Sequence, residues 1–223
     1  MTERRPAVGC DEAGKGPVLG PMVAAAVRAD PDRLPDAVDD SKRLSPARRE
    51  EIDAALRGDD AVAVGVAVVS TDRIDDPATD MNSLTVAAHA EAVASVARDG
   101  DAVLADAGDV DEARFARRVR EGVADAGPAV AVDAEHGADG RDPLVAAASV
   151  AAKVERDARI EAIEAAYAAH APIGSGYPSD PTTRDFLRRY VDDTGELPDC
   201  ARASWATAAD VLAAAEQSEL SNF

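Results

Sequence analysis

The 223-residue sequence predicts an α/β layer fold built on a mixed sheet. Three apolar, strand-like segments come first, and helical and strand-like segments then alternate along the chain. This order is typical of folds in which helices cover a mixed sheet. The C-terminal third has only helical patterns, so we expect it to pack on or beside the layered part.

Five segments have the composition of strands, because each is short, rich in Val or Ala, and bounded by turn or loop residues. The first leads into a Gly-Lys-Gly turn, and the fourth is followed at once by Asp106. The expected strands are Ala7–Glu12, Pro21–Arg28, Ala61–Val69, Ala102–Ala105 and Ala129–Asp133.

Six segments are expected to be helical, and three of them have clear N-terminal signals. Ser45 with Pro46 and Asp142 with Pro143 are each typical of an N-cap followed by the first helical residue, and Asp111 is a further N-cap. The expected helices are Pro46–Arg57, Asn82–Arg98, Asp111–Val123, Pro143–His170, Thr182–Val191 and Ser204–Glu216.

The chain is strongly acidic, with 43 acidic against 24 basic residues and a net charge of −19 spread over its whole length. This composition favours a folded protein from a very salty cytoplasm, because about 1 M salt screens charges beyond about 3 Å. At such salt the counterion-release contribution to nucleic-acid binding is nearly gone for any protein. The net charge therefore does not exclude a nucleic-acid partner.

Cysteine use and hydropathy indicate the compartment. Cys10 and Cys200 lie far apart and fit neither metal-ligand nor redox spacing, so we expect two buried thiols in a reducing cytosol. The sequence has no signal peptide and no apolar run of about 20 residues. The prediction is a soluble, cytoplasmic protein.

Asp11 and Glu12 precede a Gly-Lys-Gly turn at the end of the first strand. Carboxylates bind Mg²⁺ or Mn²⁺, and a glycine turn lets backbone N–H groups approach a sugar-phosphate chain. Adjacent strand residues point to opposite faces, so both carboxylates reach one metal cluster only if the strand ends there, as the turn predicts. This pairing suggests metal-dependent phosphate chemistry.

Other acidic residues are candidates for the same site. Asp106 ends the fourth strand and has no capping role to explain it, whereas Asp111 is adequately explained as an N-cap. Near the fifth strand periodicity leaves the choice open, because Asp142 looks like an N-cap while Asp133 and Asp139 have no assigned role.

The long helix carries Ser149, Lys153 and Arg156 on one face of an Ala- and Val-rich sequence. This stripe is either a solvated face or part of a site. Lysine is scarce, and all three lysines (Lys15, Lys42 and Lys153) lie in motif-like surroundings, which favours a role for the ammonium groups.

Seven segments together resemble ribonuclease HII of the archaeal type, here from an extreme halophile, from Val8 to about Ala208. The resemblance implies a ribonuclease-H-like mixed five-stranded sheet flanked by helices, with a core over 1–170, a helical part over 171–216 and a flexible tail over 217–223. The matching segments are GCDEAGKGPVLGPMV, DSKRLSPARREEI, MNSLTVAAHAEAV, LADAGDVDEARF, EHGADGRDPLVAAASVAAKVERD, GSGYPSDPTTRDFL and ASWAT.

The resemblance also implies a catalytic and metal-binding site formed by Asp11, Glu12, Asp106 and Asp139, which would hold two Mg²⁺ or Mn²⁺ ions. The family cleaves the RNA strand of RNA–DNA hybrids and nicks duplex DNA 5′ to an embedded ribonucleotide, leaving 3′-hydroxyl and 5′-phosphate ends. Residues expected to bind the substrate are Gly14, Lys15, Gly16, Lys42, Ser149, Lys153 and Tyr177.

Within that set, the glycine turn would sense the 2′-hydroxyl and Tyr177 would stack on the neighbouring deoxyribose. The family usually has Gly-Arg-Gly where this chain has Gly14-Lys15-Gly16. Lysine binds phosphate as a point charge without the bidentate fork of arginine, so a tight preference for single ribonucleotides is less secure.

The C-terminal residues Gln217, Leu220 and Phe223 fit Gln-x-x-Leu-x-x-Phe, which looks like the motif that docks repair proteins on the sliding clamp. We therefore expect a clamp partner and a monomeric enzyme without membrane attachment. Two alternative functions are a ribonuclease-H-fold nuclease that ignores the 2′-hydroxyl and a non-catalytic module that binds hybrids or the clamp.

Overall fold

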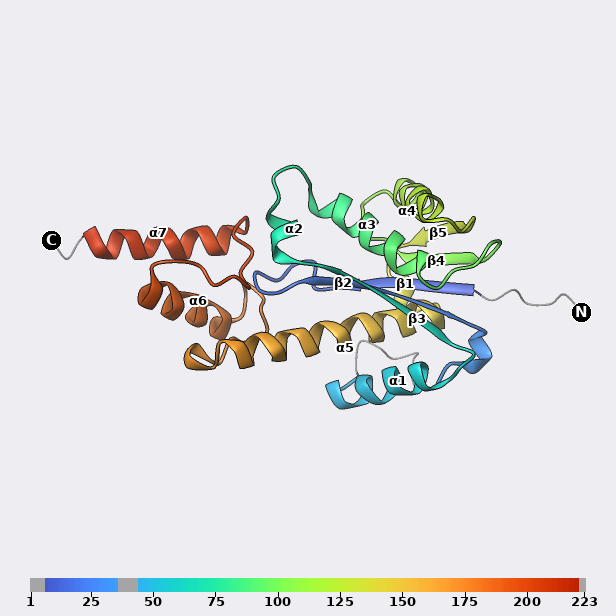
Figure 1. The fold of residues 1–223 in the computed structure, drawn as a ribbon, viewed down its shortest axis with the longest axis horizontal. Helices are drawn as coiled ribbons and strands as arrows, with labels where there is room; N and C mark the ends of the chain where they lie inside the picture. The colour runs from blue at the N-terminus through green and yellow to red at the C-terminus, as the bar shows by residue number, and fades with distance from the viewer. Residues whose placement is uncertain (1–6, 36–43, 221–223) are drawn as a thin grey trace, which may run out of the picture. The chain divides into compact units, whose positions relative to one another are not determined.

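The computed structural model describes residues 7–35 and 44–220 (Figure 1). The chain forms two compact units. The first consists of Met1–Ala13, Met22–Val68 and Met81–Arg156, and the second of Gly14–Pro21, Val69–Asp80 and Asp157–Phe223. The units interleave along the sequence, because Gly14–Pro21 and Val69–Asp80 belong to the same unit as the C-terminal helices.

The first unit is built on a mixed five-stranded sheet with the order β3-β2-β1-β4-β5, which confirms the predicted fold class. The central strand β1 pairs antiparallel with β2 and parallel with β4, and β4 pairs parallel with β5. The strands are β1 Ala7–Ala13, β2 Met22–Ala29, β3 Ala63–Val69, β4 Ala102–Asp106 and β5 Ala131–Glu135.

Helices cover both faces of this sheet (Figure 1): α3 and α4 lie over one face, and α1 and α5 over the other. Gly9 of β1 shows how closely α5 approaches. A Cβ at Gly9 would lie 2.1 Å from the backbone carbon of Leu144, so only glycine fits there. Apolar residues of β2, α1 and α5 form the core on this face, among them Val27, Ile52 and Val150.

The predicted helix starts are confirmed by their caps. Ser45 accepts from the amide of Arg48 at the start of α1, Asp111 accepts from Arg114 at the start of α4, and Asp142 accepts from Leu144 at the start of α5. The longer helices are α1 Pro46–Gly58, α3 Met81–Ala94, α4 Glu112–Ala126, α5 Pro143–Ala166, α6 Pro181–Thr194 and α7 Ala206–Leu220.

Several predicted boundaries were wrong. Helix α3 ends four residues before the predicted end at Arg98, and α5 ends at Ala166, where a separate 3₁₀ turn covers Ala168–His170. Helix α7 continues past Glu216 to Leu220, so the expected tail is helical over its first residues. The five-residue helix α2, Thr71–Asp75, was missed because it is too short to show helical periodicity.

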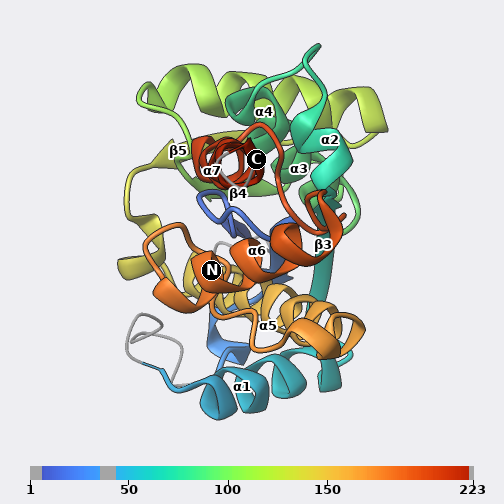
Figure 2. The same cartoon turned by 90° about the vertical axis from the view of Figure 1, so that its left-hand side faces the viewer.

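The second unit has its own core, formed where α6 and α7 pack side by side (Figures 1 and 2). Leu19 forms a β-bridge with Ala201, which joins the segment after β1 to the C-terminal part of the chain. Phe186 of α6 and Ile173 are fully buried in this core. Among the described helices none is long and apolar enough to cross a membrane.

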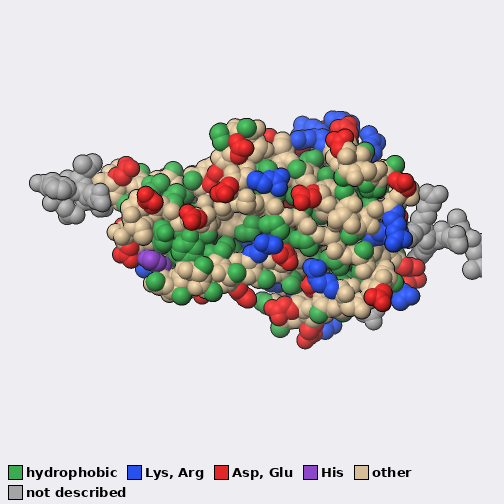
Figure 3. Space-filling view, in the orientation of Figure 1, with side chains coloured by type: hydrophobic (Ala, Val, Ile, Leu, Met, Phe, Trp, Pro, Cys, Tyr) green, Lys and Arg blue, Asp and Glu red, His purple; other side chains and the backbone are tan. Residues whose placement is uncertain are grey.

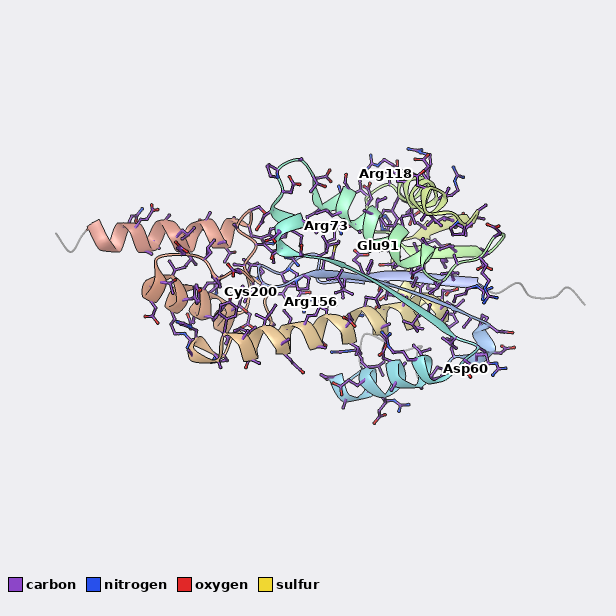
Figure 4. The ribbon with its side chains drawn as sticks, viewed as in Figure 1. Asp60, Arg73, Glu91, Arg118, Arg156 and Cys200 are labelled. Carbon is purple, nitrogen blue, oxygen red and sulfur yellow. The ribbon has the colours of Figure 1, made fainter. Side chains whose placement is uncertain are left out.

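Surface charges of both signs are interspersed on the face shown in Figure 3. Arg118 of α4, labelled in Figure 4, donates to the hydroxyl of Ser83 in α3 at 2.9 Å and so ties these helices together. Cys10 and Cys200 are both buried thiols, as predicted. Burial raises the pKa of the Cys200 thiol to about 12.

One ion pair of the first unit is almost fully buried. Arg28 of β2 donates to both carboxylate oxygens of Asp101, at 2.7 and 3.3 Å, and the Arg98 amide donates to the same carboxylate at 2.8 Å. Burial alone raises the pKa of Asp101, but these hydrogen bonds outweigh it and the pKa is lowered. The ionised form is therefore stabilised in the folded state.

We expect Asp101→Asn to lower the free energy of unfolding by about 3 kcal/mol at neutral pH, because Arg28 would remain buried without its counter-charge. A carboxyl whose folded pKa is lowered contributes stability above its unfolded pKa and loses it as the pH falls through the folded pKa. The difference between the two proteins should thus shrink below about pH 4.

Denaturant titrations at pH 7 and pH 3.5 would measure this effect. The matched control is Asp185→Asn, which removes an exposed pair with Arg188 and should cost less than about 1 kcal/mol. A deficit of the Asp101 variant that stays constant between the two pH values would contradict the assignment.

Candidate active site

Asp11 and Glu12 both lie within the paired part of β1, opposite Ala25 and Ala24 of β2. The predicted strand end at Glu12 was wrong, because β1 continues to Ala13. The two side chains therefore point to opposite faces of the sheet. Glu12 bonds to His89 of α3, with 2.8 Å between its Oε2 and the ring Nε2, whereas Asp11 is hydrogen-bonded to Ser149 of α5.

Asp11 is 6% exposed and lies among other carboxylates. Burial, followed by the negative charge of Glu12 and then that of Asp106, raises its pKa to about 7, although the hydrogen bond from Ser149 acts in the opposite direction. A carboxyl keeps its proton near neutral pH where burial and neighbouring negative charges are not offset by nearby positive groups.

Asp106 and Asp139 approach the same region from β4 and from the 3₁₀ turn Ala138–Gly140. Asp106 accepts a hydrogen bond from the Ala138 amide at 2.7 Å. Burial raises the pKa of Asp106, and the charges of Asp139 and Glu12 raise it further. Because β1 and β4 are parallel neighbours, the carboxylates gather where these two strands end.

The other acidic candidates have structural partners or lie in solvent. Asp109 is held by two hydrogen bonds from Arg114, at 2.5 and 3.0 Å, and Asp111 and Asp142 cap helices. Asp133 is exposed on β5. The choice of Asp139 is thus compatible with the structure, because Asp139 is buried and adds to the charge around Asp106.

Within the described residues, no three His, Cys, Asp or Glu side chains are placed so that they could share one metal ion as they stand. The donor set nevertheless suits Mg²⁺ or Mn²⁺, which prefer oxygen ligands. A divalent ion would also offset the negative charges of Glu12 and Asp106, which together with burial raise the pKa of Asp11.

Two of the expected substrate-binding residues lie next to Asp11. The Lys153 ammonium group donates to the Ser149 hydroxyl at 2.6 Å, and Ser149 is in turn bonded to Asp11. Ser149 and Arg156 are 1% and 7% exposed, so the stripe on α5 is not a solvated face. The structure therefore places Ser149 and Lys153 beside the carboxylate cluster.

The Gly14–Gly16 turn belongs to the second unit, where Arg202 organises it. The fully buried Arg202 guanidinium donates to the backbone carbonyls of Gly20, Lys15 and Gly14 at 2.9, 2.9 and 2.6 Å. It stacks on Trp205 at 4.9 Å, and the indole Nε1 donates to the Gly16 carbonyl at 3.2 Å.

Sequence reasoning missed Arg202, although the ASWAT segment that follows it was recognised. The chain has 24 basic residues, and all but three of them are arginines, so no composition signal marks this one. Gly14 has φ 83°, in the left-handed region that favours glycine, so the fold of the turn depends on both glycine and the Arg202 contacts.

Tyr177 lies beside the same turn, because a Cβ at Gly16 would be 3.8 Å from its ring. Tyr177 is 41% exposed. Asp180 holds the loop by accepting hydrogen bonds from the amide and hydroxyl of Ser175, at 2.7 and 2.8 Å. These bonds lower the pKa of Asp180 to about 2.

Two candidate residues lie outside the described part of the chain: Lys42 and Phe223. Of the remaining clamp-motif residues, Gln217 lies in α7 and Leu220 is the last residue of that helix. The spacing of this motif stays a sequence-based prediction.

Comparison with known proteins agrees with the fold. The chain matches the family model described as Ribonuclease HII over residues 8–208. A Ribonuclease HII from Halobacterium salinarum is 61% identical over 215 residues, which cover 96% of this chain and 98% of that protein.

Two solved structures are similar over nearly the whole chain. The ribonuclease H2 of Pyrococcus horikoshii OT3 has a TM-score of 0.85 and 35% identity, with 96% of this chain and 100% of that chain covered. The PCNA:RNase HII complex from Archaeoglobus fulgidus contains a chain with a TM-score of 0.80 and 37% identity, covering 92% and 96%. The chain described here therefore belongs to the ribonuclease HII family and is a ribonuclease H enzyme.

Proposed function

We propose that this protein hydrolyses the RNA strand of RNA–DNA hybrids and nicks duplex DNA on the 5′ side of an embedded ribonucleotide. The products would carry 3′-hydroxyl and 5′-phosphate ends. The observation that carries this proposal is the crowding of carboxylates around Asp11, whose pKa is raised by burial and by Glu12 and Asp106. Membership of the ribonuclease HII family supports the substrate class.

Asp11, Glu12, Asp106 and Asp139 would hold two divalent ions, Mg²⁺ or Mn²⁺. When bound, such a pair activates the attacking water and stabilises the leaving 3′ oxygen of an in-line displacement. Binding requires the Asp11 carboxyl to give up its proton. Ser149 would then keep its hydrogen bond to the ionised Asp11, with Lys153 donating to the Ser149 hydroxyl.

Recognition of RNA would depend on the second unit. Backbone groups of Gly14, Lys15 and Gly16 would contact the 2′-hydroxyl, and the exposed ring of Tyr177 would stack on the neighbouring deoxyribose. The ammonium groups of Lys15, Lys42 and Lys153 would contact phosphates as point charges.

The test is a DNA duplex with one ribonucleotide, incubated with Mn²⁺ or Mg²⁺ in multimolar KCl. We expect a single nick 5′ to the ribonucleotide that is lost with chelator and absent from an all-DNA duplex. Cleavage of long hybrids alone would keep the ribonuclease but contradict nicking at single ribonucleotides. Cleavage of the all-DNA duplex would favour a nuclease that ignores the 2′-hydroxyl.

A non-catalytic module that binds hybrids is the alternative. The observation that favours it is that no three described His, Cys, Asp or Glu side chains are placed to share one ion. Folded protein that binds a hybrid in multimolar KCl but cleaves neither substrate with either metal would establish this alternative.

We further propose that the C-terminal motif docks the enzyme on a sliding clamp. The relative from Archaeoglobus fulgidus has been solved as a PCNA:RNase HII complex, and helix α7 carries Gln217 and Leu220 at its end. In the motif Leu220 and Phe223 are three residues apart, the spacing of one helical turn, which would present one apolar face to a hydrophobic pocket.

Deleting residues 217–223 should abolish clamp binding and leave cleavage of short duplexes within about twofold of the parent, because no proposed active-site residue is removed. Calorimetric titration with the organism's own clamp measures the first and nuclease kinetics the second. Replacing Ser218 and Glu219 by alanine is the matched control and should preserve binding. Unchanged clamp binding after the deletion would disprove the docking role.

A further inference from the structure

His89 of α3 is a fully buried histidine, while the other two histidines of the chain are partly or largely exposed. Its ring Nε2 lies 2.8 Å from Oε2 of Glu12, and the ring packs edge-on against Phe115 with centroids 5.1 Å apart at 82°. Nδ1 has no hydrogen-bond partner among the described residues. Glu12 is the group that Nε2 contacts, and the Cys10 thiol also lies beside the ring.

The bond to His89 also fixes where the second oxygen of Glu12 lies. A Cβ at Gly108 would be 3.4 Å from Oε1 of Glu12, so this oxygen lies beside the loop that follows β4. Gly108 is two residues beyond Asp106, whose pKa is raised in part by the charge of Glu12. One carboxylate oxygen therefore faces α3 and the other faces the end of β4.

Packing alone does not explain an imidazole at this position. Apart from Thr85 and His89, the buried side chains of α3 are apolar, among them Val86, Ala90 and Val93. Burying a ring nitrogen without a partner costs free energy that a Leu or Phe side chain would not. The hydrogen bond to Glu12 is the feature that an apolar residue could not supply.

We propose that His89 is a positioning residue that holds Glu12 so that Oε1 is directed toward Asp106, and that this bond sets the affinity of the site for a divalent ion. The inference rests on the proposed function of Glu12 as a metal ligand. Groups that hydrogen-bond to a metal ligand orient it, and their loss typically weakens metal affinity by about 10–100-fold. The donor role needs a proton on Nε2, which both the neutral Nε2–H tautomer and the imidazolium carry.

The experiment is a calorimetric titration of the substrate-free protein with Mn²⁺ in multimolar KCl. We expect His89→Leu to raise the Kd for Mn²⁺ by about 10–100-fold. His89→Gln keeps an N–H donor at this position and should remain within about threefold of the parent. The control Phe115→Leu alters the packing of the ring but keeps its hydrogen bond, and should change stability more than Mn²⁺ affinity.

A double variant separates positioning from a general loss of structure. If His89 acts through Glu12, then His89→Leu should have little further effect on Mn²⁺ affinity once Glu12 is replaced by Gln. A purely structural role would weaken binding by the same factor in both backgrounds.

Three results would overturn the inference: the same Mn²⁺ affinity for His89→Leu and the parent, equal losses for the Leu and Gln variants, or additive effects in the double variant. Failure of the proposed function gives a different result. The parent protein itself would then not bind Mn²⁺, and this would also disprove the inference about His89.

Discussion

Replacing Asp106 by Asn should lower kcat by at least about 1000-fold, equivalent to about 4 kcal/mol of transition-state stabilisation, while the fold stays intact. Burial raises the pKa of Asp106, and the negative charges of Asp139 and Glu12 raise it further. In the proposed mechanism this substitution removes one of the four carboxylates that would hold the metal ions. Asparagine can still accept the hydrogen bond from the Ala138 amide, so the local backbone keeps its partner.

The same substitution should not destabilise the metal-free protein. A carboxyl whose folded pKa is raised above its unfolded value disfavours folding as the pH rises through that range, because the folded state holds the proton more tightly. Asp106→Asn removes this penalty. We therefore expect an unchanged or higher free energy of unfolding at pH 7, which separates a functional residue from a structural one.

Single-turnover cleavage of a ribonucleotide-containing duplex measures the rate, and denaturant titration of the metal-free protein measures the stability. Asp133→Asn is the matched control, because Asp133 is an exposed acid on the neighbouring strand β5 and should leave kcat within about twofold. A rate for Asp106→Asn within tenfold of the parent would mean that the carboxylate site is assigned wrongly.

Replacing Arg202 by Met should lower the free energy of unfolding by about 3 kcal/mol, since three backbone carbonyls would each lose a charged donor at about 1 kcal/mol or more. The affected carbonyls belong to Gly14 and Lys15 of the proposed ribose-sensing turn and to Gly20, which follows it in the chain. We therefore also expect kcat/KM for a single-ribonucleotide duplex to fall by more than about tenfold, equivalent to about 1.4 kcal/mol.

Trp205 is the only tryptophan in the chain and contacts both Arg202 and the Gly16 carbonyl, so its fluorescence during denaturation reports on this turn directly. Arg188→Met provides the control. Its exposed i,i+3 pair with Asp185 should contribute less than about 1 kcal/mol. If Arg202→Met unfolds at the same denaturant concentration as the parent, Arg202 does not hold the turn.

Local sequence signals determined much of this protein. The five strands and the caps at Ser45, Asp111 and Asp142 follow from alternation, apolar runs and turn residues, all of which act over a few neighbouring positions. The family could also be identified from the sequence, because its motifs are short segments that can be read without knowing the fold.

Tertiary structure alone decided the arrangement of the site. Whether β1 ends at Glu12 or continues to Ala13 depends on pairing with β2, and that pairing sends Asp11 and Glu12 to opposite faces of the sheet. The partner of Glu12 is 77 residues away in His89, and Arg202 bonds to Gly14 across 188 residues. No local pattern encodes such contacts, because they form only when packing brings distant segments together and buries the groups that must then find hydrogen-bond partners.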